Sequence, residues 1–270
     1  MPRPSMPLID YYSLESPVAT EFRRLLHSFL KKAKEGELKS ILFTSAITSE
    51  GKSTVASLMS ITAAYKGHKT LLIDCDLRRP SLHRLFAFER QRGMSEVLYN
   101  GDEIKSVIKK TSLDNLDVIT AGKAVAHPAE LFDSRTIGGL IHELKFYYDF
   151  VFVDTPPVIP VSDPMLLAQE MDGAVLIVKA GSTAREVAQR ATKILSNGQI
   201  NLLGVVLNNV KGSLPYYYDY SHYNYDYSQR NDNGKPLNNR RHPGMAPAAG
   251  ATADKPDKKA ESPGKKGISR

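Results

Sequence analysis

Apolar residues follow two different spacings between residues 39 and 210. Six short runs, such as Phe150–Asp154, are almost continuously apolar, which is the pattern of parallel strands covered on both faces. Longer stretches between them, such as Ala184–Ser196, have the spacing of helices. This alternation predicts an α/β fold, with a mostly parallel sheet and helices on both of its faces. The six predicted strands are 40–45, 70–75, 116–121, 150–154, 174–179 and 202–208.

A further helix is predicted before the first strand, within residues 15–34. Ser16 is a suitable N-cap and Pro17 suits the first helical position. The helix would carry one apolar stripe, made of Val18, Phe22, Leu25, Leu26 and Phe29. We expect residues 1–14 to be flexible and residues 15–211 to form one folded domain.

The last part of the chain has a different composition. Residues 211–270 contain only three of the residue types Leu, Ile, Val and Phe, too few to offset the entropy of ordering. We therefore expect a disordered tail over residues 212–270. The same 60 residues hold 11 Lys and Arg against 6 Asp and Glu, which is +5 of the chain's net charge of +7. With only +2 on the remainder, the folded part is not expected to bind nucleic acid. The basic end serves either solubility or a weak attraction to anionic lipid.

The composition excludes several other classes of protein. Apolar residues make up 41% of the chain, which is enough for a sizeable core. No run approaches the ~18 apolar residues of a membrane span, and residues 1–10 do not resemble a signal peptide. One cysteine, Cys75, rules out a disulfide framework and favours a reducing compartment. The seven histidines are too scattered for a metal cluster.

The strongest motif is Ala46-Ile47-Thr48-Ser49-Glu50-Gly51-Lys52-Ser53-Thr54. It fits the phosphate-binding loop G-x-x-x-x-G-K-[ST], except that Ala46 replaces the first glycine. This replacement is conservative if the position requires a small residue rather than a positive φ. The backbone amides of such a loop bind phosphates, while Lys52 would reach the β and γ phosphates and Ser53 would ligate Mg²⁺.

Three carboxylates lie at the carboxyl ends of two of the predicted strands. Asp74 and Asp76 come after Leu71-Leu72-Ile73, and Asp154 comes after Val151-Phe152-Val153. The carboxyl ends of parallel strands share one sheet edge, so these groups should meet the phosphate loop there. Carboxylates beside a phosphate chain imply a bridging Mg²⁺. Asp76 has an alternative role, since it could simply pair with Arg78 or Arg79.

Together these motifs resemble the bacterial protein-tyrosine kinases (BY-kinases) of capsule and exopolysaccharide synthesis. The resemblance covers about residues 15–227 and includes Arg78–His83, Gly93–Leu98, His127–Phe132, Ser162–Pro164 and Gly204–Asn208. It implies an ATP- and Mg²⁺-dependent autokinase in which Lys52, Asp74 and Asp76 are catalytic, and one of the two aspartates, Asp74 being preferred, accepts the tyrosine proton or places the metal. It also implies a nucleotide site of Ser49, Glu50, Gly51, Lys52, Ser53 and Thr54, and a Mg²⁺ site of Ser53, Asp76 and Asp154. From its place at a strand end, Asn208 is a further candidate for the nucleotide site, where it would select adenine.

The family phosphorylates a tyrosine-rich C-terminal cluster, and this chain has one within 216–227. It contains 7 of the 13 tyrosines, and it begins eight residues after Asn208. Eight extended residues span at most about 26–29 Å, which allows the cluster to reach its own active site or a neighbour's. The predicted phosphoacceptors are Tyr216, Tyr217, Tyr218, Tyr220, Tyr223, Tyr225 and Tyr227.

The resemblance also implies partners. These are a separate membrane protein of the polysaccharide co-polymerase type that activates the kinase, further copies of the chain in a ring, a tyrosine phosphatase, and proteins of sugar metabolism. The expected location is the cytoplasm, peripheral to the inner face of the membrane. The chain departs from the family's helix motif E-x-x-R-x-x-R, because Glu21 and Arg24 match but His27 takes the last place. A neutral imidazole would weaken a charge pair between subunits.

Two other functions are compatible with a phosphate loop. A positioning ATPase of the ParA/MinD type would carry a second lysine early in the loop, where this chain has Ile47, and would lack the tyrosine cluster. A non-catalytic adaptor that binds nucleotide only to assemble would not need Asp74, Asp76 and Asp154. The sequence therefore favours the kinase.

Overall fold

The computed structural model describes residues 6–34 and 38–210. The helices are η1 (Leu8–Tyr11), α1 (Pro17–Lys34), α2 (Lys52–Tyr65), α3 (Leu82–Leu85), α4 (Met94–Asn100), η2 (Ile104–Val107), η3 (Pro128–Leu131), α5 (Ser134–Tyr147), α6 (Asp163–Ala168) and α7 (Arg185–Asn197). The strands are β1 (Ser40–Ser45), β2 (Thr70–Asp74), β3 (Lys109–Lys110), β4 (Leu116–Ile119), β5 (Phe150–Asp154), β6 (Gly173–Lys179) and β7 (Leu202–Asn208). The predicted tail and its tyrosine cluster lie outside the described residues.

The strands form one sheet in the order β3-β4-β2-β5-β1-β6-β7. All neighbouring pairs are parallel except β3 with β4, which confirms the predicted α/β fold. The six predicted strands are present, and all of them begin and end within two residues of the prediction. The sequence did not indicate β3, because two lysines at a sheet edge carry no apolar period.

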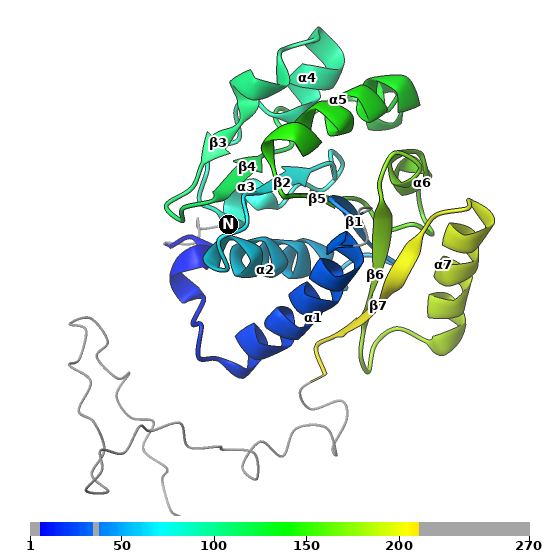
Figure 1. The fold of residues 1–270 in the computed structure, drawn as a ribbon. Coiled ribbons are helices and arrows are strands. Elements are labelled where there is room, and N and C mark those ends of the chain that lie inside the picture. Colours follow the sequence, from blue (N-terminus) through cyan, green and yellow to red (C-terminus); the bar gives the residue numbers. More distant parts are fainter. Residues whose placement is uncertain (1–5, 35–37, 211–270) are drawn as a thin grey trace, which may run out of the picture. The chain divides into compact units, whose positions relative to one another are not determined.

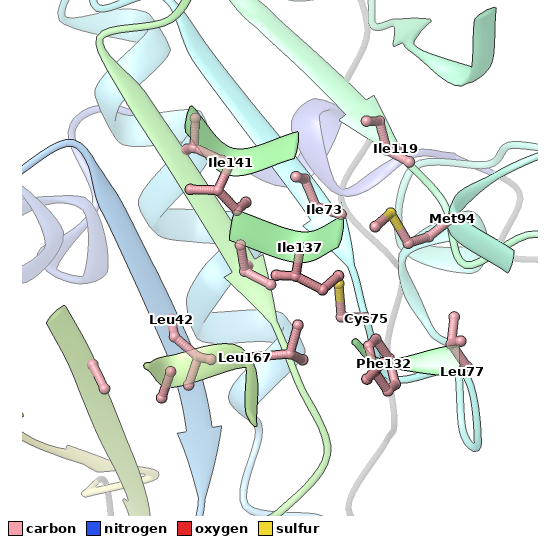
Figure 2. Close-up of a cluster of buried hydrophobic side chains, with 14 of the residues drawn as sticks. Leu42, Ile73, Cys75, Leu77, Met94, Ile119, Phe132, Ile137, Ile141 and Leu167 are labelled. Atoms are coloured by element: carbon pink, nitrogen blue, oxygen red, sulfur yellow. The ribbon is translucent and has the colours of Figure 1, made fainter. Parts of the chain in front are cut away.

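Alternate residues of the central strands face two separate cores. Leu42, Ile73 and Val153 pack with α4, α5, α6 and α7 on one face, and Figure 2 shows Ile137 and Ile141 of α5 beside Ile73. Phe43, Leu72 and Phe152 pack with α1 and α2 on the other face, as the two helices in Figure 1 illustrate. Burial on both faces explains why the strand sequences are almost continuously apolar.

The N-terminal segment corrects one expectation. Residues 1–14 were expected to be flexible, but η1 buries Ile9 against the core, and the Tyr12 hydroxyl lies 2.5 Å from the hydroxyl of Thr62 on α2. The Tyr12 ring also stacks on Tyr65, with centroids 5.8 Å apart. Apolar and aromatic contacts therefore hold residues 8–12 against α2.

The first long helix follows the predicted capping. The Ala19 amide donates to the Ser16 hydroxyl oxygen at 3.1 Å, as expected of an N-cap, and Leu26 and Phe29 are buried. Val18 was placed on the apolar stripe, but it is 53% exposed, and Ala19 is the buried residue of that turn. None of the helices in the described part of the chain is long and apolar enough to cross a bilayer.

Candidate active site

The phosphate loop connects β1 to α2 as its motif predicts. Ala46 is fully buried and does not have a positive φ, so its position requires a small residue rather than a glycine. Positive φ values occur instead at Ser49 (65°) and Gly51 (89°). A Cβ added to Gly51 would lie 2.2 Å from the side-chain nitrogen of Asn208, so this position accepts only glycine.

Lys52 lies at the first position of α2, close to two of the three carboxylates. Its Nζ is 2.7 Å from Asp76 Oδ2 and 3.6 Å from Asp154 Oδ1, and 3.3 Å from the Ser53 hydroxyl. Burial lowers the pKa of Lys52, but Asp154 and Asp76 outweigh it and the net pKa is raised. The ammonium group therefore remains charged within this acidic cluster.

Asp74 and Asp154 are opposite each other on the neighbouring strands β2 and β5. Both are fully buried. Burial, followed by the charge of Asp154, raises the pKa of Asp74 from 3.8 to about 8. Burial also raises the pKa of Asp154 to about 6, against the opposing effect of Lys52. Two buried carboxylates side by side are an electrostatically unfavourable arrangement, which a bound cation would relieve.

The residues present fit a magnesium ion. Both carboxylate oxygens of Asp154 are buried without a hydrogen-bond partner among the described residues, as expected of a group that accepts a metal or its water. The donors nearby are carboxylate and hydroxyl oxygens, which Mg²⁺ prefers. Within residues 6–34 and 38–210, no group of three His, Cys, Asp or Glu side chains could hold a metal alone.

Asp74 and Asp76 occupy different environments. Asp74 accepts backbone hydrogen bonds from Asp76 at 3.1 Å, Ser81 at 3.1 Å and Leu82 at 3.0 Å. Asp76 accepts one from Arg79 at 2.9 Å, and its other oxygen pairs with Lys52. Only Asp76 of the two lines the pocket beside the phosphate loop. Asp76, and not Asp74, therefore forms part of the pocket wall, and which of the two accepts the tyrosine proton stays a prediction.

Glu50 is a buried clamp rather than an exposed ligand. Its carboxylate accepts hydrogen bonds from the Ile47 amide at 2.7 Å, from the Lys179 amide at 3.3 Å and from the Thr183 hydroxyl. Its backbone carbonyl accepts one from the Asn208 side chain at 2.8 Å. Glu50 therefore ties the phosphate loop to β6 and β7, and only its backbone amide remains a candidate for the nucleotide.

Asn208 was predicted to lie near the nucleotide, and it does contact the phosphate loop. Its side-chain nitrogen bonds to Glu50 and its side-chain oxygen accepts from the Asn209 amide at 2.8 Å. The side chain is thus engaged with backbone at both ends, which supports a positioning role. A contact with adenine stays a prediction.

A pocket of about 460 Å³ opens beside the loop. It is lined by Ser49, Gly51, Lys52, Ser53 and Thr54 on one side, and by Asp76 and the following residues on another. A third side comes from the loop after β5, which includes Pro156 and Val161. The predicted phosphate-binding residues other than Glu50 and Asn208 therefore line one cavity. The predicted phosphoacceptors lie outside the described residues.

One interaction of the site was not anticipated. The Arg78 guanidinium bonds to both carboxylate oxygens of Asp163, at 3.0 and 3.4 Å, and links the loop after β2 to the start of α6. Both residues belong to segments already noted for their family resemblance. Their pairing could not be predicted, because 85 residues separate them.

Comparison with known proteins identifies the family. A family model described as "ParA: NUBPL iron-transfer P-loop NTPase" matches residues 38–223. The tyrosine-protein kinase YwqD of Bacillus subtilis is 37% identical over 184 residues, which cover 68% of this chain and 78% of YwqD.

Solved structures agree. The chimerical protein CapA2B2 superposes with a TM-score of 0.70 at 32% identity, over 74% of this chain and 88% of the other. The kinase domain of the Escherichia coli tyrosine kinase ETK gives 0.67 at 31% identity, over 69% and 73%.

Positioning ATPases are more distant. A MinD protein of Pyrococcus horikoshii, solved with Mg-ADP, gives a TM-score of 0.55 at 22% identity, over 63% of this chain and 70% of MinD, which establishes a shared fold alone. The expected kinase resemblance is confirmed, and the ParA/MinD alternative is disfavoured. The chain belongs to the ParA-type P-loop NTPase family and, within that fold, to the bacterial tyrosine-protein kinases.

Proposed function

We propose that this chain is an ATP-dependent autokinase. It transfers the γ-phosphoryl group of ATP to the tyrosines within residues 216–227, either of the same chain or of another copy. In this role it would regulate capsular or exopolysaccharide synthesis and export. The observation that carries the proposal is the convergence of Lys52, Asp76 and Asp154 beside the phosphate loop. Phosphoryl transfer requires this kind of positioning and charge neutralisation, and little covalent chemistry from the protein.

The phosphate loop would hold the triphosphate. The amides of Ser49, Gly51 and Thr54 and the N-terminus of α2 are suited to phosphate oxygens, and Lys52 would neutralise the β and γ phosphates. Ser53, Asp76 and Asp154 would hold Mg²⁺, which when bound offsets charge on the phosphates. Asp76, which lines the pocket, would meet the metal there, and one of the pair Asp74 and Asp76 would accept the tyrosine proton. Asp74 would fix the backbone around it.

β7 ends beside this site. Asn208, the last residue of β7, is bonded to the phosphate loop, and Tyr216 follows eight residues later. The tyrosines are therefore within reach of their own active site and of a neighbour's, and the family resemblance favours the neighbour's in a ring of subunits. A separate membrane protein would activate the kinase and hold it at the inner face of the membrane. A phosphatase would reverse the reaction, and enzymes of sugar metabolism are candidate substrates.

The test is phosphorylation of the full chain by ATP and Mg²⁺ in the presence of a cytoplasmic activator segment, followed by mass spectrometry of the tail. We expect phosphate on tyrosines 216–227 and its loss in Lys52→Met. The matched control is Lys66→Met, which removes an exposed lysine beyond the far end of α2. Release of phosphate with no phosphotyrosine would contradict the proposal and favour a positioning ATPase.

A further inference from the structure

Two exposed arginines line the pocket and pair with no carboxylate of the described residues. Arg78, Arg79 and Arg84 all border the cavity beside the phosphate loop. Arg78 is neutralised by Asp163. Among residues 6–34 and 38–210, neither Arg79 nor Arg84 forms an ion pair. Residues 76–85 form a wall of the cavity separate from the phosphate loop. This arginine wall therefore presents two uncompensated positive charges to the cavity.

The backbone that carries these arginines is fixed by the acidic residues of the site. The amide of Arg79 donates to Asp76 at 2.9 Å. Asp74 accepts from Ser81 and Leu82 at the start of α3, and Arg84 lies within that helix. Both side chains consequently project from a segment whose position relative to Asp76 is set by hydrogen bonds. A ligand held by the arginines would have a defined place relative to the reacting groups.

The chemistry of the pair selects an anion. The phosphates of the nucleotide already have the loop amides, the N-terminus of α2 and Lys52 on a different wall of the cavity. The remaining reactant is the acceptor segment. Within residues 216–227 the only charged side chains are Asp219 and Asp226, and each lies directly between two tyrosines. This segment contains neither lysine nor arginine, so its charge complements that of the arginine wall.

We propose that Arg79 and Arg84 form a docking subsite for an acidic group beside the acceptor tyrosine, either an aspartate or a phosphotyrosine. The proposal rests on the autokinase function and names the substrate class that the site prefers. Guanidinium groups bind carboxylate and phosphate through paired, charge-assisted hydrogen bonds. Each phosphotyrosine adds about −1.5 to −2 charges at neutral pH. A segment that has been phosphorylated once therefore docks more tightly, and later phosphorylations of the cluster are favoured over the first.

The experiment separates docking from transfer. The enzyme is the full chain with its seven cluster tyrosines changed to Phe, and the acceptors are peptides of residues 214–229. One peptide is native, one carries Asp219→Asn and Asp226→Asn, and one is native with phosphotyrosine at position 220. Peptide binding is followed by fluorescence anisotropy in the presence of Mg-ADP. Transfer is followed with the activator segment present, as KM and kcat for the peptide at saturating Mg-ATP and as the KM for ATP at saturating peptide.

The variants are Arg79→Gln with Arg84→Gln, and the control is Arg92→Gln. Arg92 is another exposed arginine, paired with Asp102 and absent from the pocket lining. We expect the double variant to bind the native peptide about tenfold more weakly than wild type does. Its loss of affinity for the phosphopeptide should be larger still. The peptide with Asp219→Asn and Asp226→Asn, called the neutral peptide, should bind equally to the wild type and to the double variant. The KM for ATP should not change.

Equal binding of the native and neutral peptides to the wild-type chain, or an equal loss of both in the double variant, would overturn the docking subsite. A rise in the KM for ATP without a change in peptide binding would do the same, because it would assign the arginines to the nucleotide. If no peptide accepts phosphate from the wild-type chain, the autokinase proposal fails in this assay, whereas the anisotropy measurements still decide whether the arginines bind an acidic segment.

Discussion

The side-chain nitrogen of Asn208 lies 2.8 Å from the backbone carbonyl of Glu50, and this bond joins the last residue of β7 to the phosphate loop. The same nitrogen occupies the space that a Cβ on Gly51 would need. The loop is therefore shaped partly by the strand that leads to the tyrosine cluster.

This contact predicts the effect of Gly51→Ala. The new methyl group would collide with Asn208 at a residue whose φ is +89°, so the loop must shift. We expect nucleotide affinity to fall at least about tenfold while the fold is retained, measured with a fluorescent ATP analogue. The matched control is Gly67→Ala, with a similar φ of +85° and no atom within 4 Å of the added Cβ. Adding Asn208→Ala to this variant should restore part of the nucleotide affinity. If Gly51→Ala binds the nucleotide as tightly as wild type does, Asn208 has no steric role.

Glu50→Gln tests the buried clamp. The glutamine side chain places an NH₂ group where a carboxylate oxygen accepts a backbone amide, so at least one of the hydrogen bonds from Ile47 and Lys179 is lost. We expect the free energy of unfolding to fall by about 1–3 kcal/mol, measured by urea denaturation. Thr183→Val removes only the hydroxyl contact and should lose about 1 kcal/mol. The clamp would be refuted by a Glu50→Gln variant as stable as wild type.

The carboxylates of the site predict how stability depends on pH. Burial raises the pKa of Asp74 to about 8 and that of Asp154 to about 6, above the 3.8 of an exposed carboxyl group. The folded chain therefore holds protons that the unfolded chain has released, and stability is lost as the pH rises from about 4 through 8. We expect the melting temperature, measured without nucleotide or metal, to decline over this range.

Asp154→Asn isolates the contribution of one carboxylate. The oxygens of Asp154 have no hydrogen-bond partner among the described residues, so the amide loses no such bond and gives up only the ion pair with Lys52 at 3.6 Å. We expect the gain in stability over wild type to be larger at pH 8 than at pH 5, because the pKa of Asp154, about 6, lies between these values, while tyrosine phosphorylation falls at least about a hundredfold. A variant that is destabilised equally at both pH values would show that the Asp154 charge does not strain the fold.

His27 predicts weak self-assembly. It is exposed on α1, one turn after Arg24, and stands where the family motif has a second arginine. Restoring that residue with His27→Arg should increase the molar mass seen by light scattering, because a permanent charge strengthens a pair between subunits. The control is Ser28→Arg, which adds the same charge at the neighbouring exposed position. An equal mass increase in both variants would mean that charge alone, rather than the motif, drives assembly.

Much of the site could be predicted because its parts are local. A strand, a phosphate loop and a helix occur within residues 40–65, and the acidic groups directly follow apolar strands. The rule that parallel strands end at one edge then brings Lys52, Asp76 and Asp154 together. The same local rules predicted the N-cap at Ser16. They did not predict that residues 8–12 pack on α2, because so short a segment has no helical or strand period and its contacts come from residues about 50 positions away, such as Thr62.

The amino-acid sequence by itself determined the α/β architecture, the phosphate loop and the acidic strand ends, since each depends on spacing within a short segment. Only the tertiary structure decided which side chains serve as clamps and which line the cavity. Glu50 with Lys179, and Arg78 with Asp163, are separated by 129 and 85 residues. Such pairs form when the sheet brings distant loops together, and no local pattern encodes the distance between them.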